Sequence, residues 1–279
     1  MTRLAAAFLV IAMFSSLTIV SPLRAEESSA SPAERVEIPL NPLPFVLKGS
    51  LRRPDGEGPF PAVILLPACG YLAPSAEQIW GQALLSWGFV TLTLDVFTPR
   101  GVVGQKTCIA PVSPELAEDA YRALNVLAKR KYVDPKHVFV IGFGRSSSLV
   151  FAAVERDGIE RTATRRFRGA VAFYPPACGA VKGAMTVATL IIAGARDPFL
   201  ETCRNLAEGN DDMGISRQRG VGPPIQLAIM AYAYSGFDLP MFQKPVDVRG
   251  VHIEYSQSAT DQAKEALRRF MQSMVEPYQ

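Results

Sequence analysis

The stretch Val138-Phe139-Val140-Ile141-Gly142-Phe143-Gly144-Arg145-Ser146-Ser147-Ser148 decides the fold of this chain. Its first half is a run of β-branched and aromatic residues that ends at Gly142, as expected for a buried strand. A helical pattern begins near Ser146, and small residues there allow a strand and a helix to pack closely. The stretch therefore predicts a strand, a sharp turn and a helix in immediate succession.

This layout is typical of a nucleophile elbow, the G-x-S-x-G turn that presents one reactive side chain on a strained backbone. Counting from Gly142, the presented position is Gly144. Glycine carries no hydroxyl or thiol with which to attack a carbonyl carbon. The scaffold of the elbow is thus predicted without its attacking atom.

Apolar segments alternate with helical patterns along the rest of the chain. Such alternation predicts an α/β fold with a doubly wound, mostly parallel sheet and helices on both of its faces. The expected strands are 36–40, 45–51, 62–66, 89–94, 137–143, 168–174, 187–193 and 226–232, of which the first two are edge strands. The expected helices are 75–87, 113–131, one starting near 146, 201–208 and 257–274.

The N-terminus has the pattern of a secretory signal peptide. One early positive charge, Arg3, precedes a short apolar run, and the small residue Ala25 stands at a polar boundary. The apolar run is too short to span a membrane core of ~30 Å. We expect residues 1–25 to be cleaved and residues 26–35 to form a loose leader, with 36–279 as one domain. The mature protein is then periplasmic or secreted, with no membrane attachment.

The amino-acid composition limits the classes of molecule that this protein is expected to bind. Removal of residues 1–25 leaves 27 basic and 26 acidic residues, a net charge of +1. This balance favours neither nucleic acid nor an anionic membrane as a partner. A small-molecule ligand or substrate remains the expected partner.

Four cysteines remain in an exported chain, which favours disulfides over four buried free thiols. Of the three possible connectivities we expect Cys69–Cys108 and Cys178–Cys203, because each pair lies in loops on one side of the predicted sheet. With two well-separated histidines and no C-x-x-C spacing, no metal site is expected. No nucleotide, flavin or nicotinamide cofactor is expected either, since the elbow glycines do not form G-x-G-x-x-G.

Five stretches together resemble the dienelactone hydrolase family of the α/β-hydrolase fold, in its exported branch, over about 62–274. They are Leu66-Pro67-Ala68-Cys69-Gly70, Leu94-Asp95-Val96-Phe97-Thr98-Pro99-Arg100-Gly101, the elbow, Ile192-Ala193-Gly194-Ala195-Arg196-Asp197, and Tyr232-Ala233-Tyr234-Ser235-Gly236-Phe237-Asp238. The resemblance implies the α/β-hydrolase fold and hydrolysis of esters or lactones by a Ser or Cys, His and Asp triad.

The residues at the triad positions depart from that pattern. The family's acid is matched by Asp197, but Gly144 stands in place of its Ser or Cys and Ser235 in place of its histidine. A nucleophile needs an adjacent base, and the base needs a partner that orients it. We therefore expect a degenerate triad that does not turn over esters in the usual way. A small apolar or acidic ligand, or a protein partner, is then the expected occupant of the old pocket.

The alternative is an active ester or lactone hydrolase that uses Ser146, two residues past the apex, with His252 or an unusual base. The competing interpretations are that Ser146 starts or packs the helix and that His252 makes a structural hydrogen bond. Asp197 in turn can cap the following helix.

The residues expected around the pocket fall at strand ends and in the loops that follow them. The aromatic ones are Tyr71, Phe97, Phe143, Tyr174 and Tyr234. Arg100 and Arg145 either hold an anionic ligand at the pocket mouth or are solvent-facing or ion-paired arginines. The backbone amides near Cys69 and Arg145 are candidates for an oxyanion-binding pair, because they do not depend on side chains.

Overall fold

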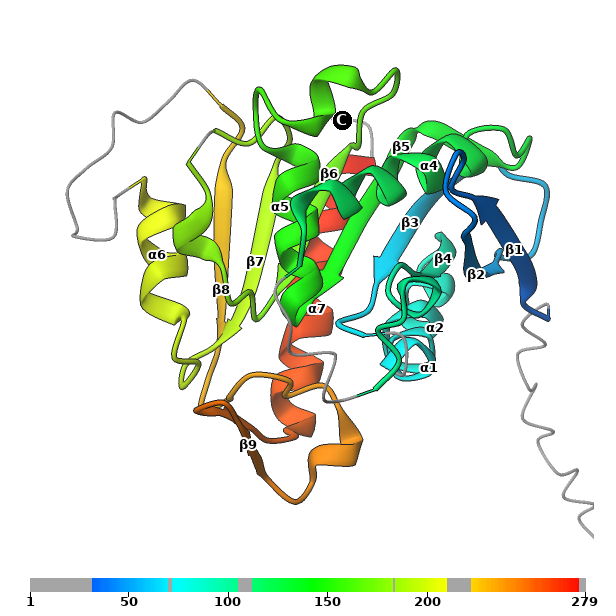
Figure 1. Cartoon of the computed structure of the whole chain (residues 1–279). Helices are drawn as coiled ribbons and strands as arrows, with labels where there is room; N and C mark the ends of the chain where they lie inside the picture. The colour runs from blue at the N-terminus through cyan, green and yellow to red at the C-terminus, as the bar shows by residue number, and fades with distance from the viewer. Residues whose placement is uncertain (1–31, 70–71, 105–111, 183, 210–221, 276–279) are drawn as a thin grey trace, which may run out of the picture.

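The computed structural model describes residues 32–69, 72–104, 112–182, 184–209 and 222–275. Eight strands form one sheet in the order β1-β2-β4-β3-β5-β6-β7-β8 (Figure 1). The pairs β1–β2 and β2–β4 are antiparallel and the remaining pairs are parallel. The strands are β1 Glu34–Pro39, β2 Val46–Arg52, β3 Phe60–Leu66, β4 Val90–Asp95, β5 Val133–Phe143, β6 Gly169–Phe173, β7 Thr189–Gly194 and β8 Ile225–Met230. The predicted mostly parallel sheet is confirmed.

Helices cover both faces of the sheet, with α4 and α5 in front and α7 behind in Figure 1. The longer helices are α4 Glu118–Leu127, α5 Ser147–Val154, α6 Leu200–Glu208 and α7 Gln257–Val275. One further continuous helical segment consists of α1 Ala73–Ala76, the π-helical η2 Glu77–Gly81 and α2 Gln82–Ser86. Short 3₁₀ segments are η3 Thr98–Arg100, η4 Pro114–Ala117, η5 Gly144–Ser146, η6 Ile159–Thr162, η7 Cys178–Ala180 and η8 Pro240–Phe242.

The apolar character of the central strands explains this layering. In β3, Ile64 packs into the core on the α4 and α5 side, whereas its neighbour Leu65 packs into the core on the side of Trp80 and α7. A strand that buries both faces needs apolar residues at successive positions rather than at alternate ones. The uninterrupted apolar runs therefore mark the central strands.

A small hairpin, β9 Val246–Val248 with β10 Val251–Ile253, follows β8 and was not expected from the sequence. Ile253 forms a parallel bridge with Ser235. The hairpin is thereby fixed next to the segment after β8 that carries Ser235.

Cysteine pairing agrees with the expectation where the structure describes it. The Cys178–Cys203 disulfide joins the loop after β6 to α6, with an S–S distance of 2.06 Å. Cys69 is also disulfide-bonded, and no described cysteine is free. Cys108 lies outside the described residues.

The expected signal peptide, residues 1–25, also lies outside the described residues. The sheet begins at Glu34, two residues earlier than expected, because Glu34 and Arg35 pair with Leu51 and Ser50 of β2. Among the helices of the described ranges, none has the length and apolar character needed to cross a bilayer.

Candidate active site

The apex of the elbow is Gly144, which follows the last residue of β5. Its backbone lies in the left-handed region, with φ of 53°. A Cβ added there would meet Ala68 Cβ and Tyr174 Cε2 at 3.5 Å each, which is ordinary contact. A Cβ added at Gly142 would instead lie 2.6 Å from both the Ser146 carbonyl oxygen and Val150 Cγ2. Gly142 is therefore required by the close approach of α5, whereas the space at Gly144 accommodates a side chain that the sequence lacks.

Asp197 and Ser235 meet at the ends of β7 and β8. The Ser235 hydroxyl donates a hydrogen bond of 2.5 Å to Asp197 Oδ2, and the Phe199 backbone N–H donates one of 2.8 Å to Oδ1. Both side chains are buried. Burial raises the pKa of Asp197, and the two hydrogen bonds oppose that rise because they stabilise the charged carboxylate.

Tyr174 borders the apex, because a Cβ added at Gly144 would lie 3.5 Å from Tyr174 Cε2. It is buried, has an unusual φ of 36°, and packs edge-on against Phe237 with ring centroids 5.7 Å apart. Burial raises the pKa of Tyr174 well above its usual value, and the carboxylates of Asp238 and Asp197 raise it further. The phenol therefore stays neutral at physiological pH.

A second buried acid, Asp238, interacts with the Tyr174 side chain. Its Oδ2 accepts a hydrogen bond of 2.6 Å from the Trp80 indole N–H. Burial raises the pKa of Asp238, and interactions with Trp80 and Tyr174 lower it in part. Sequence reasoning did not single out Trp80 or Asp238. Asp238 belongs to the Tyr232–Asp238 stretch, but nothing in the helical pattern around Trp80 marks it as the partner of a carboxylate.

Ser146 and His252, the candidates for a substitute nucleophile and base, make their hydrogen bonds with different partners. Ser146 is fully buried, and its hydroxyl donates to the Pro67 carbonyl oxygen at 2.6 Å. This bond ties the elbow to the loop after β3. The neighbouring Ser147 hydroxyl bonds to backbone carbonyls of β5 and β6, both at 3.0 Å. The serines thus hold the elbow to its surroundings.

His252 lies on β10, with its ring 4.3 Å from that of Tyr234 between centroids. Its Nδ1 is 3.4 Å from Asp247 Oδ1, and its Nε2 is 3.3 Å from Glu254 Oε2. The imidazole therefore contacts two carboxylates on its own hairpin region rather than Asp197.

The residues expected to line the pocket are mostly packed into the core. Phe143 and Phe173 stack at 4.9 Å between centroids, and Phe97 is buried under the Arg145 guanidinium, 4.7 Å from the ring centroid. Tyr234 packs under Arg196. Tyr71 lies outside the described residues. Cys69 follows β3 and Arg145 follows the apex, and their backbone amides stay a predicted oxyanion-binding pair.

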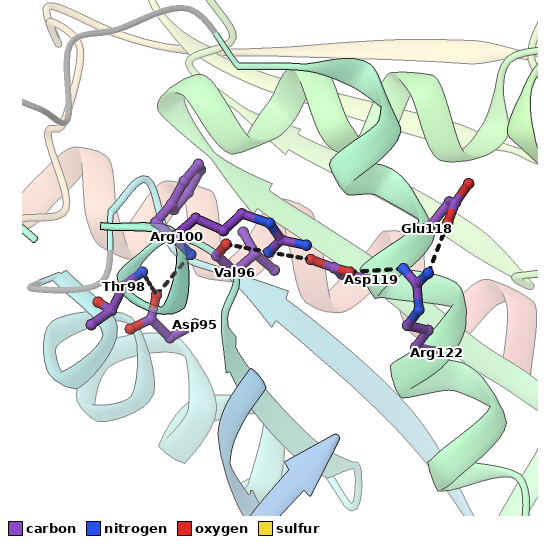
Figure 2. A network of polar contacts seen from close by, with 8 residues as sticks. Asp95, Val96, Thr98, Arg100, Glu118, Asp119 and Arg122 are labelled. Carbon is purple, nitrogen blue, oxygen red and sulfur yellow. Dashed lines mark hydrogen bonds and ion pairs between the residues drawn. The ribbon is translucent and has the colours of Figure 1, made fainter. Parts of the chain in front are cut away.

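Of the two alternatives for Arg100, the structure shows the ion pair: Arg100 belongs to a network around the buried Asp119 (Figure 2). Its Nη1 lies 2.7 Å from Asp119 Oδ2 and donates to the Val96 carbonyl oxygen at 2.7 Å. Arg122 reaches the other Asp119 oxygen at 3.0 Å and Glu118 at 2.9 Å. Burial raises the pKa of Asp119, and both arginines oppose that rise. Arg100 thus joins the loop after β4 to α4.

Within the described part of the chain, no group of three or more His, Cys, Asp or Glu residues is placed to hold a metal ion.

No protein-family model and no curated protein matches this chain. Among solved structures, the dienelactone hydrolase of Anabaena variabilis is similar, with 15% identity and a TM-score of 0.61 over 87% of this chain and 97% of that one. A dienelactone hydrolase-like promiscuous phosphotriesterase from metagenomic libraries has 18% identity and a TM-score of 0.59, covering 88% and 99%. A thermostable carboxylesterase cloned from a metagenomic library has 16% identity and a TM-score of 0.61, covering 89% and 90%.

The chain has the α/β-hydrolase fold. The α/β-hydrolase sheet accounts for the position of the elbow between β5 and α5. It also accounts for the acid and the Ser235 segment after β7 and β8, since ligands of open α/β sheets bind at the carboxyl ends of the strands.

Proposed function

We propose that this protein uses a dienelactone hydrolase-like scaffold to bind a small molecule and does not hydrolyse esters through a Ser-His-Asp mechanism. The observation that carries the proposal is the Ser235–Asp197 hydrogen bond beside an apex occupied by Gly144. The retained acid holds a hydroxyl where a triad acid holds an imidazole.

This arrangement supplies neither of the two groups that acyl transfer needs, a general base and a nucleophile. A serine hydroxyl that donates to a carboxylate has no basic nitrogen to take a proton from a nucleophile, and its own pKa lies far above that of imidazole. At the apex, Gly144 provides no atom that forms an ester bond. Asp197 is left as a buried acid that orients Ser235.

We propose that the chain is exported to the periplasm or secreted, because residues 1–25 have the features of a cleaved signal peptide. The neighbouring structures are described as hydrolases and esterases, and their chemistry is theirs. In this chain the buried aromatic surroundings of Gly144 favour a ligand with apolar surface.

The direct test is turnover by the purified mature protein. We expect no hydrolysis of p-nitrophenyl acetate above the rate of an unrelated protein, and no labelling by a serine-directed fluorophosphonate probe. The Ser146→Ala variant is the matched control, because Ser146 is the serine nearest the apex in the chain. Ester hydrolysis that disappears in Ser146→Ala, together with probe labelling of Ser146, would instead establish the alternative, an active hydrolase.

A further inference from the structure

A cavity of about 790 Å³ lies between two helical walls, apart from the elbow. One wall is the continuous segment of α1, η2 and α2, the other is α7, and η8 and Tyr255 complete the lining. The volume is within the ~300–1,000 Å³ usual for small-molecule sites. None of Gly144, Asp197 and Ser235 lines this cavity. It is therefore distinct from the position of the triad.

The wall formed by α1, η2 and α2 presents only uncharged side chains to the cavity. They recur at intervals of three and four residues, which places them on a single face of the helical segment. These residues are Ser75, Gln78, Ile79, Gln82, Ala83, Ser86 and Trp87. On α7, most of the charged residues are exposed and do not line the cavity, namely Asp261, Glu265, Arg268 and Arg269. The two helices thus turn a weakly charged face toward each other.

Three polar side chains of the lining are available to a ligand. Within the described part of the chain, Gln78, Gln82 and Lys264 have no hydrogen-bond or ion-pair partner. In contrast, the Tyr255 hydroxyl already donates to Gln257 Oε1. A glutamine amide both donates and accepts hydrogen bonds, so Gln78 and Gln82 match hydroxyl groups, which also do both.

A buried carboxylate and an unusual helical turn occur at the same cavity. Asp238 lines the cavity and accepts the Trp80 hydrogen bond on Oδ2, while its Oδ1 is buried without a hydrogen-bond partner in the described structure. A buried acceptor of this kind favours a bound molecule that brings a donor. Trp80 belongs to η2, which is π-helical, and such turns are rare and frequently occur at functional sites.

The charges and the apolar residues of the lining limit the class of ligand. Its charged residues are Asp238 and Lys264, which are opposite in sign, so the lining does not select a strongly charged molecule. Ile79, Pro240 and Met241 add apolar surface, and Met241 is 51% exposed. A neutral molecule with several hydroxyl groups and one apolar face fits both properties.

We propose that this cavity binds a neutral saccharide. Its hydroxyl groups bond to the amides of Gln78 and Gln82, and the apolar face of a sugar ring packs against Ile79 and Met241. The site uses none of the residues at the triad positions, so it stands whether or not the protein hydrolyses esters.

The test is isothermal titration of the mature protein with two neutral disaccharides, maltose and cellobiose, and with the anionic sugar glucuronate. We expect at least one disaccharide to bind saturably at millimolar concentration and at least fivefold more tightly than glucuronate. Its affinity should not change as salt rises, because the ligand is uncharged. Tryptophan fluorescence should change with the same affinity, since the two tryptophans of the chain are Trp87 in the lining and Trp80 in the same wall.

Single variants locate the site. Gln78→Ala and Gln82→Ala should each weaken disaccharide binding at least fivefold, because each removes a hydrogen bond to the ligand. Both positions are exposed on a helix, where alanine is favoured, so these variants should melt at the temperature of the native protein or higher. That result separates lost binding from lost folding. Gln262→Ala is the matched control, because Gln262 is an exposed glutamine of α7 that does not line the cavity, and its affinity should be unchanged.

Any of three results would overturn the proposal. The first is no saturable binding of either disaccharide at millimolar concentration. The second is tighter binding of glucuronate than of both disaccharides, which would make Lys264 the centre of an anion site. The third is unchanged affinity in both Gln78→Ala and Gln82→Ala.

Discussion

Ser235 donates a hydrogen bond to Asp197 across the ends of two neighbouring parallel strands, and both residues are buried. A buried carboxylate is costly unless donors surround it. Here the donors are one hydroxyl and one backbone N–H, that of Phe199. The pair is therefore a structural unit that keeps a carboxylate buried at the edge of the sheet.

The first prediction concerns the pH dependence of this pair. Ser235→Ala should lower the free energy of unfolding by about 2 kcal/mol at pH 7, because a hydrogen bond to a charged group is lost and Asp197 Oδ2 is left without a donor. The bond favours the charged carboxylate and holds the pKa of Asp197 below the value in the variant. The hydrogen bond therefore stabilises the native protein at pH values above the pKa of Asp197. That stabilisation is lost as the pH falls through the pKa of Asp197 in the native protein.

The measurement is urea unfolding of both proteins at pH 7 and near pH 3.5. The difference between them should shrink at the lower pH, where the carboxyl is protonated. Ser86→Ala is the control, because the exposed Ser86 hydroxyl bonds only to a helix carbonyl. An equal loss at both pH values would show that Asp197 is not charged in the native protein.

The second prediction contrasts the two glycines of the elbow. Gly142→Ala should cost about 3 kcal/mol, since its Cβ would overlap the backbone of Ser146. Gly144→Ala should cost only about 1 kcal/mol, because space is available and the strain comes from its φ of 53° alone. Thermal unfolding of both variants decides this. A larger loss for Gly144→Ala would mean that residue 144 is not the open apex.

The third prediction concerns Arg100. Arg100→Ala should lower the free energy of unfolding by about 3 kcal/mol, because it leaves the fully buried Asp119 with one arginine instead of two. Arg269→Ala, which breaks an exposed pair with Glu265 on α7, should cost less than about 0.5 kcal/mol. Chemical unfolding of the two variants compares them. If both variants lost equally little free energy of unfolding, the ion pair of Arg100 would not stabilise the fold, and Arg100 would again be a candidate ligand contact.

Much of this architecture follows from the sequence, because the signals are local. The central strands are unbroken apolar runs, and the turn after Gly142 is marked by glycines and small serines. The resemblance to the dienelactone hydrolase family also placed Asp197 and Ser235 after two consecutive expected strands, 187–193 and 226–232. In the structure the two side chains meet there.

Other features depend on contacts that no local pattern contains. The strands of the β9–β10 hairpin are three residues long, too short for a periodicity to appear. The partner of Arg100 lies on another helix, and that of Trp80 lies 158 residues away. Ser146 fits either the nucleophile or the packing interpretation in the sequence, and only its bond to Pro67 distinguishes them.

The central claim is that residues 144 and 235 are the vacated positions of a nucleophile and its base. Restoring both, as Gly144→Ser with Ser235→His, should create hydrolysis of p-nitrophenyl acetate that neither single variant shows. A Cβ fits at position 144, and the Asp197 carboxylate is already placed to orient a histidine at 235. Nucleophile and base act as a unit, so their effects should not be additive.

The decisive measurement is the initial rate of p-nitrophenyl acetate hydrolysis by the native protein, the two single variants and the double variant. Melting temperatures confirm that each is folded, and the double variant carrying Asp197→Asn is the matched control. We predict a rate at least a hundredfold above the native protein for the double variant alone, lost again with Asp197→Asn. A folded double variant no faster than Gly144→Ser, or a native protein that already hydrolyses the ester as fast, would contradict the account.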